Sequence, residues 1–147
     1  MLKKIEFETI LPIWRDHLWP GRKSQIEPVS AINSEGLINV TIQGYKPHFF
    51  GIYENHELIG VNSCHRTSLK EMRSRGLWVH PQHRHRGVGS RLLLQVFAQA
   101  KEDKASRIWT MARQSSAEFY LRLGFSAYKE TSQYEFGPHV FCEHLVT

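Results

Sequence analysis

Apolar residues alternate with polar ones in short runs that predict β-strands in the middle of the chain. One such run covers residues 48–54 and the next covers 57–63, with the turn-forming pair Asn55-His56 between them. Two runs separated by two turn residues are typical of a β-hairpin. A third run, over 71–79, ends shortly before a proline and predicts another strand.

Apolar residues at helical spacing predict three helices. The first covers 9–19, with Thr9 as its N-cap. The second covers 89–103 and has one apolar face, which predicts that it packs against a sheet. The third covers 116–123 and is stopped by Gly124, which we expect in a left-handed conformation.

The remaining segments predict turns and further strands. Residues 22–36 are polar and turn-rich, with a second short helix starting at Ser30. A short strand is predicted over 108–112, and a closing pair of strands over 134–136 and 139–145. Antiparallel strands combined with packed helices indicate an α/β fold with a mixed sheet.

The length and composition of the chain are those of one soluble domain. Its 147 residues can bury a core of their own, so we expect a single domain over 1–147. The 41% hydrophobic and 22% charged residues are typical of a globular protein. No apolar stretch approaches the ~18 residues of a membrane span, and the first residues lack the apolar core of a signal peptide. Cys64 and Cys142 are isolated thiols, which favours a reduced, cytoplasmic protein.

A basic loop containing two glycines lies between the third predicted strand and the second predicted helix. Gly87 and Gly89 remove side chains, so backbone N–H groups can approach an anion at the positive end of the helix dipole. Arg84, Arg86 and Arg91 add positive charge. The order of strand, glycine turn and helix start is typical of a phosphate site. A glycine-assisted turn with solvated arginines is the alternative interpretation.

The positive charge of the chain is concentrated near this loop. The net charge of +5 comes from 19 Lys and Arg against 14 Asp and Glu, and much of it falls between Arg66 and Arg91. A basic patch can bind nucleic acid, or a polyanionic cofactor such as coenzyme A. Because the arginines surround a glycine loop and do not follow an aromatic-lined sheet face, the sequence favours the cofactor.

Two motifs in this order resemble the GCN5-related N-acetyltransferase (GNAT) family. The first, residues 84–89, has the form Arg-x-x-Gly-x-Gly, and the second, residues 119–125, reads Phe-Tyr-Leu-Arg-Leu-Gly-Phe. The resemblance covers about residues 48–145. It implies the acyl-CoA N-acyltransferase fold, in which helices flank a central mixed, mostly antiparallel, twisted sheet.

The resemblance also implies acetyl-CoA as the acyl donor and indicates where it binds. In the family, the pantetheine arm lies along the end of the fourth strand and the pyrophosphate lies on the glycine loop. The matching positions here are Leu77, Trp78, Val79, Arg84, His85, Arg86, Gly87, Val88, Gly89 and Ser90, with Arg113 and Ser116 near the second motif. Tyr120 matches the tyrosine that protonates the leaving thiolate in many members.

The residues predicted to accept the proton of the amine are Glu71 and His65. Several family members carry a Glu or His base on the fourth strand, but the corresponding residues here are Arg73 and Arg75, which cannot accept a proton. Glu71 shares a strand face with them by alternation and can act through a water molecule, and His65 ends the preceding strand. If Arg73 and Arg75 face the acceptor groove, the substrate carries a carboxylate or phosphate near its amine.

The expected function is acetyl-CoA-dependent N-acetylation of a small-molecule or peptide amine, by direct attack in a ternary complex. A non-catalytic acyl-CoA-binding module and a small basic nucleic-acid-binding protein are the two alternatives. No metal site is expected, because His80, His83 and His85 lack a convergent spacing. We expect no nucleic-acid or membrane partner, and the sequence leaves a homodimer open.

Overall fold

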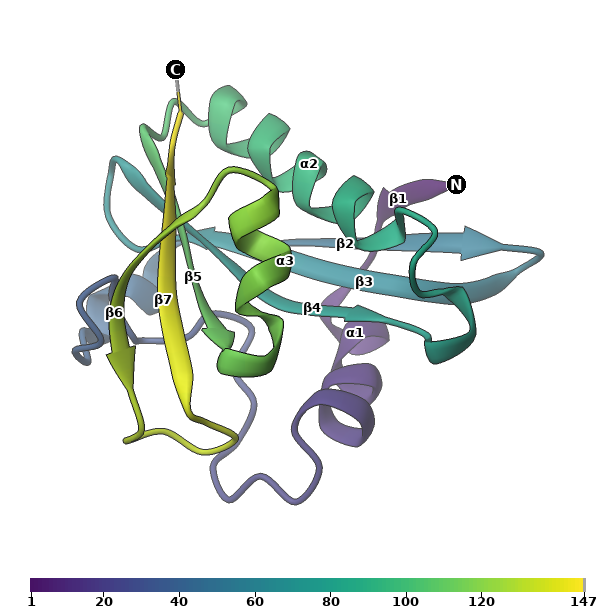
Figure 1. The fold of residues 1–147 in the computed structure, drawn as a ribbon, viewed down its shortest axis with the longest axis horizontal. Coiled ribbons are helices and arrows are strands. Elements are labelled where there is room, and N and C mark those ends of the chain that lie inside the picture. The colour runs from purple at the N-terminus through teal and green to yellow at the C-terminus, as the bar shows by residue number, and fades with distance from the viewer. Residues whose placement is uncertain (147) are drawn as a thin grey trace.

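The computed structural model describes residues 1–146, in which seven strands form one mixed sheet (Figure 1). The strands are β1 (Leu2–Lys4), β2 (His48–Glu54), β3 (Glu57–Arg66), β4 (Glu71–Val79), β5 (Arg107–Arg113), β6 (Ser126–Thr131) and β7 (His139–Leu145). Their order across the sheet is β1-β2-β3-β4-β5-β7-β6. β4 and β5 run parallel, and the other neighbouring pairs of the described residues are antiparallel. The predicted α/β class with a mixed, mostly antiparallel sheet is confirmed.

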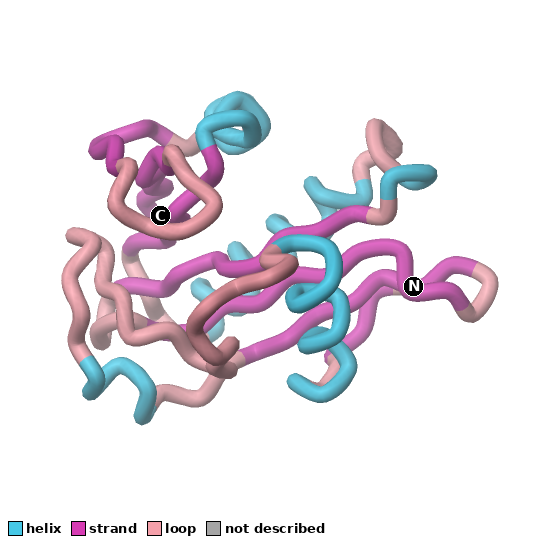
Figure 2. The backbone as a smooth tube through the Cα atoms, turned by 90° about the horizontal axis from the view of Figure 1, so that it is seen from below, coloured by secondary structure: helices cyan, strands magenta, loops and turns pink. Residues whose placement is uncertain are grey.

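Helices cover both faces of this sheet (Figures 1 and 2). One face carries α2 (Val88–Glu102) and α3 (Ala117–Arg122), and the other carries α1 (Phe7–Ile13) with the π-helical turn η1 (Trp14–Leu18) that continues it. Short 3-10 segments occupy Val40–Gly44, Pro81–His83 and Gln114–Ser116. Within residues 1–146, none of the helices is both long and apolar enough to cross a bilayer.

The predicted hairpin of β2 and β3 is confirmed. Asn55 and His56 form its turn, and both have positive φ, 51° and 67°. Positive φ at two central residues matches the twist of the flanking strands. β2 and β4 have the predicted bounds, and β3 continues to Arg66 because its last residues pair with the beginning of β4.

At the N-terminus the predicted start of the first helix is wrong and one strand was not predicted, because contacts between distant residues decide the local structure. The first helix begins at Phe7, so Thr9 is not its N-cap. The Phe7 ring packs against Trp14 and Phe49, with ring centroids 6.4 and 5.7 Å apart, and this contact extends the helix toward the N-terminus. The edge strand β1 precedes it and pairs with β2, which the short polar sequence did not indicate.

The helix predicted from Ser30 is also absent from the described residues. The Asn33 side chain there accepts hydrogen bonds from the N–H groups of Glu35 and Leu37, both at 3.0 Å. Such side-chain bonds compete with helix formation and favour a tight turn.

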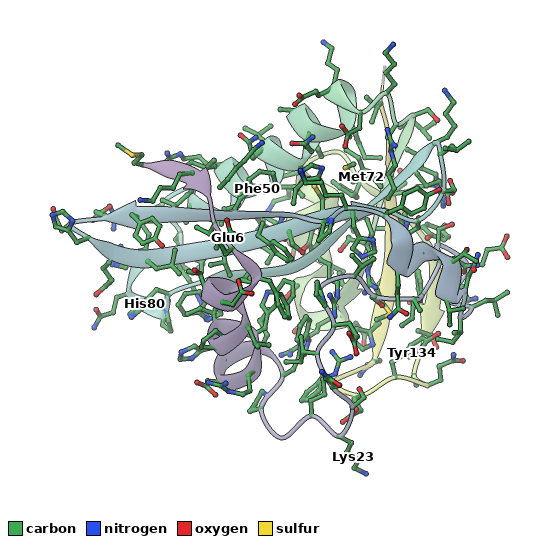
Figure 3. The ribbon with its side chains drawn as sticks, turned by 180° about the vertical axis from the view of Figure 1, so that it is seen from behind. Glu6, Lys23, Phe50, Met72, His80 and Tyr134 are labelled. Carbon is green, nitrogen blue, oxygen red and sulfur yellow. The ribbon has the colours of Figure 1, made fainter. Side chains whose placement is uncertain are left out.

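The predicted pairing of 134–136 with β7 is wrong as well. β7 pairs with β6 instead, and the Tyr134 hydroxyl donates a hydrogen bond to the carbonyl of Gly36. Figure 3 shows Tyr134 beside the long loop that carries Lys23. This loop therefore lies across the β6–β7 end of the sheet.

A β-bulge in β4 decides which residues face which layer. Ser63 pairs with Arg75 and Val61 pairs with Trp78, so β4 has one more residue than β3 in this interval. At the bulge, Gly76 has a φ of 80°. A Cβ at Gly76 would overlap the indole ring of Trp14, whose Nε1–H donates to the Gly76 carbonyl at 2.9 Å. A bulge shifts the alternation of side chains by one residue.

The two faces of β4 therefore carry different chemistry. Trp78 packs in the cluster of α1 and η1. Leu77 and Val79 pack against the larger core under α2 and α3, which also contains Phe50 and Met72 (labelled in Figure 3). The bulge thus directs the end of β4 toward α2 and leaves a tryptophan on the α1 side.

We expect Gly76→Ala to lower the free energy of unfolding by about 2–4 kcal/mol, because the new Cβ combines a positive φ with overlap onto Trp14. Gly44→Ala is the matched control, since a Cβ at Gly44 meets nothing within 4 Å. Urea denaturation of both variants measures the difference. Equal stabilities of the two variants would contradict the proposed role of Trp14 and Gly76.

Candidate functional site

The parallel strands β4 and β5 separate to form a V. They pair only at Glu71–Arg107, Met72–Ile108 and Arg73–Trp109 among the described residues, and beyond these pairs they diverge (Figure 1). From Ser74 to Val79, β4 therefore pairs with β3 on one edge and with no described strand on the other. An unpaired strand edge offers N–H and C=O groups to an extended ligand.

The narrow end of the V is closed by polar side chains. The Thr110 hydroxyl donates to the Ser74 carbonyl at 3.0 Å. This bond satisfies the first β4 carbonyl beyond the last strand pair. A ligand in the V would therefore lie above Thr110, toward the wide end.

At the wide end, the chain turns sharply from β4 into α2. His85 and Gly87 both have positive φ, 62° and 81°, and Gly87 is the residue before the helix. The first helical hydrogen bond of this turn joins the Arg91 N–H to the Gly87 carbonyl at 3.0 Å. The N–H groups of the preceding first turn have no such partner, as at every helix start. A Cβ at Gly87 would meet nothing within 4 Å, so the turn faces open space.

The predicted arginines of this loop have two different placements. The Arg84 side chain folds back onto the end of β4, where its Nε donates to the Val79 carbonyl at 3.0 Å. The Arg86 guanidinium instead contacts Glu54 at 3.0 Å and the ring of His83 at 2.6 Å. Arg84 therefore lies beside the V, whereas Arg86 is directed to the tip of the β2–β3 hairpin.

Tyr120 lies in the core beneath this loop. It is 6% exposed and packs against Phe119 and Phe125, with ring centroids 5.1 and 5.5 Å apart. A Cβ on Gly89 would be 3.3 Å from the Phe119 ring, so α3 contacts the first turn of α2. The two sequence motifs are thus brought together.

Burial raises the pKa of Tyr120 to about 12, and the Thr110 side chain is the largest opposing influence. The hydroxyl consequently lies near Thr110, at the narrow end of the V. A phenol with this pKa keeps its proton at neutral pH, so Tyr120 can act as a hydrogen-bond and proton donor.

Glu71 lies at the opposite end of β4 from the glycine loop. Eight residues of extended strand separate it from Val79, which is about 26 Å. Figure 3 shows Met72 near one end of the strand and His80 beyond the other. The Glu71 carboxylate accepts hydrogen bonds from the Ser34 hydroxyl at 3.1 Å and from Arg107. This placement is that of a structural ion pair and does not support the predicted role as a base.

His65 is buried and neutral. Its Nδ1 lies 3.0 Å from the Arg66 carbonyl and therefore carries the proton, which leaves Nε2 as an acceptor with no hydrogen-bond partner in residues 1–146. Burial, together with the charges of Arg73 and Arg75, lowers the pKa of His65 to about 3, although the hydrogen bond to the Arg66 carbonyl opposes this shift. His65 pairs with Arg73 across β3 and β4, so the imidazole lies near these arginines.

Arg22, Arg73 and Arg75 form an arginine cluster on the α1 face of the sheet. Arg73 and Arg75 are each 5% exposed. The Arg73 guanidinium lies 5.0 Å from the Trp109 ring, and that of Arg75 lies 4.9 Å from the Trp14 ring. The sequence did not indicate Arg22, because its approach to the other two depends on the loop that packs over the sheet.

Burial is the main cause that lowers the pKa of all three arginines, to about 10 for Arg73. Arg22 and Arg73 also lower the pKa of Arg75 by repulsion. Within residues 1–146, Nε and Nη1 of Arg73 are buried without a hydrogen-bond partner. The cluster therefore has more buried positive charge than its surroundings compensate.

Arg113 and Ser116 lie beyond the end of β5. The Arg113 guanidinium donates to the Leu18 carbonyl and lies 5.5 Å from the Phe136 ring. Ser116 is exposed and its side chain makes no cap hydrogen bond to α3. A depression of about 370 Å³ opens here, lined by Arg113, Gln114, Ser115, Phe136, Gly137 and Pro138. No group of three or more His, Cys, Asp or Glu side chains in residues 1–146 could hold a metal ion.

Comparison with protein-family models identifies this architecture. The model of the acetyltransferase (GNAT) domain matches residues 46–127, which include β4, the glycine loop, α2 and α3. No curated protein sequence matches the chain.

Solved structures share the fold over most or all of the chain. An acetyltransferase of the GNAT family from Staphylococcus aureus Mu50 has a TM-score of 0.68 and 18% identity, and covers 100% of both chains. An aminoglycoside 6′-N-acetyltransferase complexed with coenzyme A has a TM-score of 0.73 and 11% identity, over 100% of this chain and 97% of the other. The PaiA N-acetyltransferase of Thermoplasma acidophilum, also with coenzyme A, has a TM-score of 0.59 and 20% identity, over 67% and 60%. At these identities the similarity establishes the fold.

We expect acid to destabilise the protein through His65. Because its pKa is about 3 when folded and about 6.5 when unfolded, the unfolded state binds one more proton between these values. The free energy of unfolding therefore falls below pH 6.5, by about 1.4 kcal/mol per pH unit from this residue.

We expect His65→Gln to remove the contribution of His65 to the slope of the free energy of unfolding against pH. Urea denaturation from pH 4 to pH 6 measures this slope. His56→Asn, at the exposed hairpin turn, is the control and should keep the wild-type slope. An unchanged slope in His65→Gln would show that His65 is protonated in the folded protein.

Proposed function

The chain belongs to the GNAT family of acetyltransferases, and from this membership we propose that it transfers the acetyl group of acetyl-CoA to an amine by direct attack in a ternary complex. The family uses acetyl-CoA as its acyl donor. The proposal rests on the V between β4 and β5, where an unpaired strand edge ends beside the first turn of a fifteen-residue helix. Coenzyme A has both an amide-containing arm and a pyrophosphate, which suit a strand edge and a helix start respectively.

The residues at the wide end of the V fit this ligand. The backbone of Leu77, Trp78 and Val79 would pair with the pantetheine amides, and one N–H of this segment, at its end farther from the glycine loop, would face the thioester oxygen. The N–H groups of residues 85–90 would bind the pyrophosphate, because the left-handed Gly87 lets the ligand approach the backbone. Arg84, at the end of β4, would add charge to the same site.

Tyr120 would protonate the leaving group. Acetyl-CoA, when bound, supplies an activated thioester. The amine nitrogen forms a bond to the acetyl carbon, the carbon–sulfur bond breaks, and the sulfur takes the proton of the Tyr120 hydroxyl. Tyr120 regains a proton from solvent, so one proton is released overall when the acceptor starts as an ammonium ion. The influence of Thr110, which marks the narrow end of the V, on the pKa of Tyr120 supports this role.

The proton of the ammonium group would leave to water, which His65 Nε2 could orient; with a pKa of about 3, His65 would not hold that proton itself. His65 has a free Nε2 acceptor, whereas Glu71 is held by Ser34 and Arg107. Direct attack is favoured over an acyl-cysteine route, because burial raises the pKa of both Cys64 and Cys142 and so disfavours a thiolate.

A non-catalytic acyl-CoA-binding module is the second candidate, favoured by the buried and weakly basic state of His65. The nucleic-acid alternative loses support, because Arg73 and Arg75 are buried and do not contribute to a basic surface. Removal of the Tyr120 hydroxyl distinguishes an acetyltransferase, which should lose rate, from a non-catalytic acyl-CoA-binding module.

We expect Tyr120→Phe to lower kcat by about 10²–10⁴-fold, the usual contribution of a general acid, and to leave the Kd of acetyl-CoA within about threefold. Thiol release during acetylation of an amine panel measures the rate, and titration calorimetry measures the affinity. Tyr53→Phe, on the β2–β3 hairpin, is the control and should keep both.

Unchanged turnover in Tyr120→Phe would exclude its role as the acid. If acetyl-CoA binds but no amine is acetylated by the wild type, the module is favoured. If calorimetry detects no binding of acetyl-CoA at all, the proposed function is wrong.

A further inference from the structure

We infer that the amine acceptor carries an oxyanion, either a carboxylate or a phosphate, which binds to the arginine cluster on the α1 face beside the V. This inference rests on the proposed acetyl transfer and adds the class of substrate. It follows from three features of the cluster: its buried unpaired donors, the location of its counter-charges, and its distance from the wide end of the V.

Arg73 has buried donors that nothing in the described chain satisfies. Its Nε and Nη1 have no hydrogen-bond partner, although the side chain is only 5% exposed. The Arg73 guanidinium carbon lies over the Trp109 ring, 5.0 Å from the ring centroid. Burying an unpaired cation costs several kcal/mol. Such a group is retained most readily where a ligand of opposite charge completes it.

Another arginine of the same sheet shows what a purely structural arrangement looks like. Arg107 is bound to Glu143 at 2.7 Å and to Glu71, and so has a carboxylate on either side. Arg73 follows Glu71 by two residues on β4, yet Glu71 pairs with Arg107 and not with Arg73. The carboxylates of Glu71 and Glu143 both bind Arg107, so neither of them pairs with Arg73.

The carboxylates that influence the cluster act on Arg75 and Arg22, and none of those in residues 1–146 acts on Arg73. Glu27 acts on Arg75 and Arg22, and Glu135 acts on Arg22. Arg73 is repelled by Arg22 and Arg75 and is also influenced by three tyrosines, Tyr134, Tyr128 and Tyr120. The positive charge is therefore least compensated at Arg73, next to the narrow end of the V.

Two neutral imidazoles extend the unsatisfied surface around Arg73. His65 Nε2 and His139 Nδ1 are buried without partners in residues 1–146. Burial lowers the pKa of His139, and the charges of Arg113 and Arg73 lower it further. The oxyanion of a ligand would accept hydrogen bonds from the guanidinium, whereas His65 Nε2 accepts and would need a donor of the same ligand, such as its ammonium group or a hydroxyl.

The position of the cluster along β4 defines the length of the acceptor. Arg73 and Arg75 precede the bulge, and Leu77 to Val79 follow it. Four residues of strand, from Arg73 to Leu77, span about 13 Å. An oxyanion at the cluster and an amine at the thioester are thus separated by the dimensions of one small molecule. Trp14 and Trp19, which contact Arg75, would form the wall between them.

We expect a preference for anionic amines in matched pairs of acceptors. The pairs are glycine against glycinamide, 6-aminohexanoate against 6-aminohexanamide, and O-phosphoethanolamine against ethanolamine, which place the anion at different distances from the amine, with spermidine as a cationic acceptor. In at least one pair the charged member should have a kcat/KM more than tenfold higher. Which pair responds distinguishes a carboxylate from a phosphate. A higher kcat/KM for spermidine or for the neutral members would overturn the inference.

Arg73→Met tests the residue itself and includes a measurement on the protein without substrates. Removal of an unpaired buried cation should leave the melting temperature unchanged or raise it, while the KM for the anionic acceptor rises at least tenfold and the preference within the pair disappears. Arg73→Lys keeps the charge and should recover part of the preference. Arg107→Met is the control: it should lower the melting temperature, because two carboxylates lose their cation, and keep the preference.

A melting temperature lowered as much in Arg73→Met as in Arg107→Met, with the preference kept, would show that Arg73 is structural and would overturn the inference. Failure of the proposed function is detected separately, as absence of acetyl-CoA binding in calorimetry. If acetyl-CoA binds and neutral amines react best, the inference fails while the proposed function stands.

Discussion

The contact between Trp14 and Gly76 joins the N-terminal helix to the central strand and decides which side chains face each layer. The indole N–H donates to the Gly76 carbonyl at 2.9 Å, and the ring occupies the space that any other side chain at this position would need. Without the bulge, strict alternation would place Trp78 with Met72 and Ser74 on the α2 face. With it, Leu77 and Val79 face α2, at the side where the glycine loop begins.

The same strand separates two electrostatic environments. At its beginning, Glu71 and Arg107 form an ion pair that is partly open to solvent. Two residues further, Arg73 is buried against Trp109 with free donors. Electrostatic interactions are stronger in such a dry environment than in water. This strengthens both the attraction between Arg73 and an anionic ligand and the repulsion between neighbouring arginines. The separation of β4 and β5 begins at the next residue, so the unpaired charge and the open strand edge lie together.

Local signals were sufficient for much of the fold and for one half of the site. The Asn55-His56 turn, the bounds of β4 and the left-handed Gly124 depend on backbone preferences of a few residues, and the sequence predicts all three. The glycine loop and Tyr120 belong to motifs with fixed spacing. Their contact, through Gly89 and Phe119, follows from the packing of α3 against α2.

The acceptor side of the site was only partly predictable, because it is built by segments far apart in the chain. Alternation along β4 correctly grouped Arg73 with Arg75, but it could not show that Glu71 is bound by Ser34, 37 positions away. Nor could it show that Arg22 joins the cluster, since that depends on a loop without regular structure. The strand expected over 134–136 failed for the same reason: Tyr134 bonds to Gly36 in this loop.

The sequence by itself therefore determined the elements with local signals: the central strands β2 to β5, the α2 helix with its apolar face, the glycine turn and the family motifs. Only the tertiary structure decided the bulge at Gly76, the separation of β4 from β5 and the lack of a counter-charge for Arg73 among residues 1–146. The physical reason is that helices and turns depend on residues that are close in the sequence. An ion pair or a buried contact instead depends on all the groups that the fold brings close in space. Whether a buried charge is compensated can be judged only when all of those groups are in position.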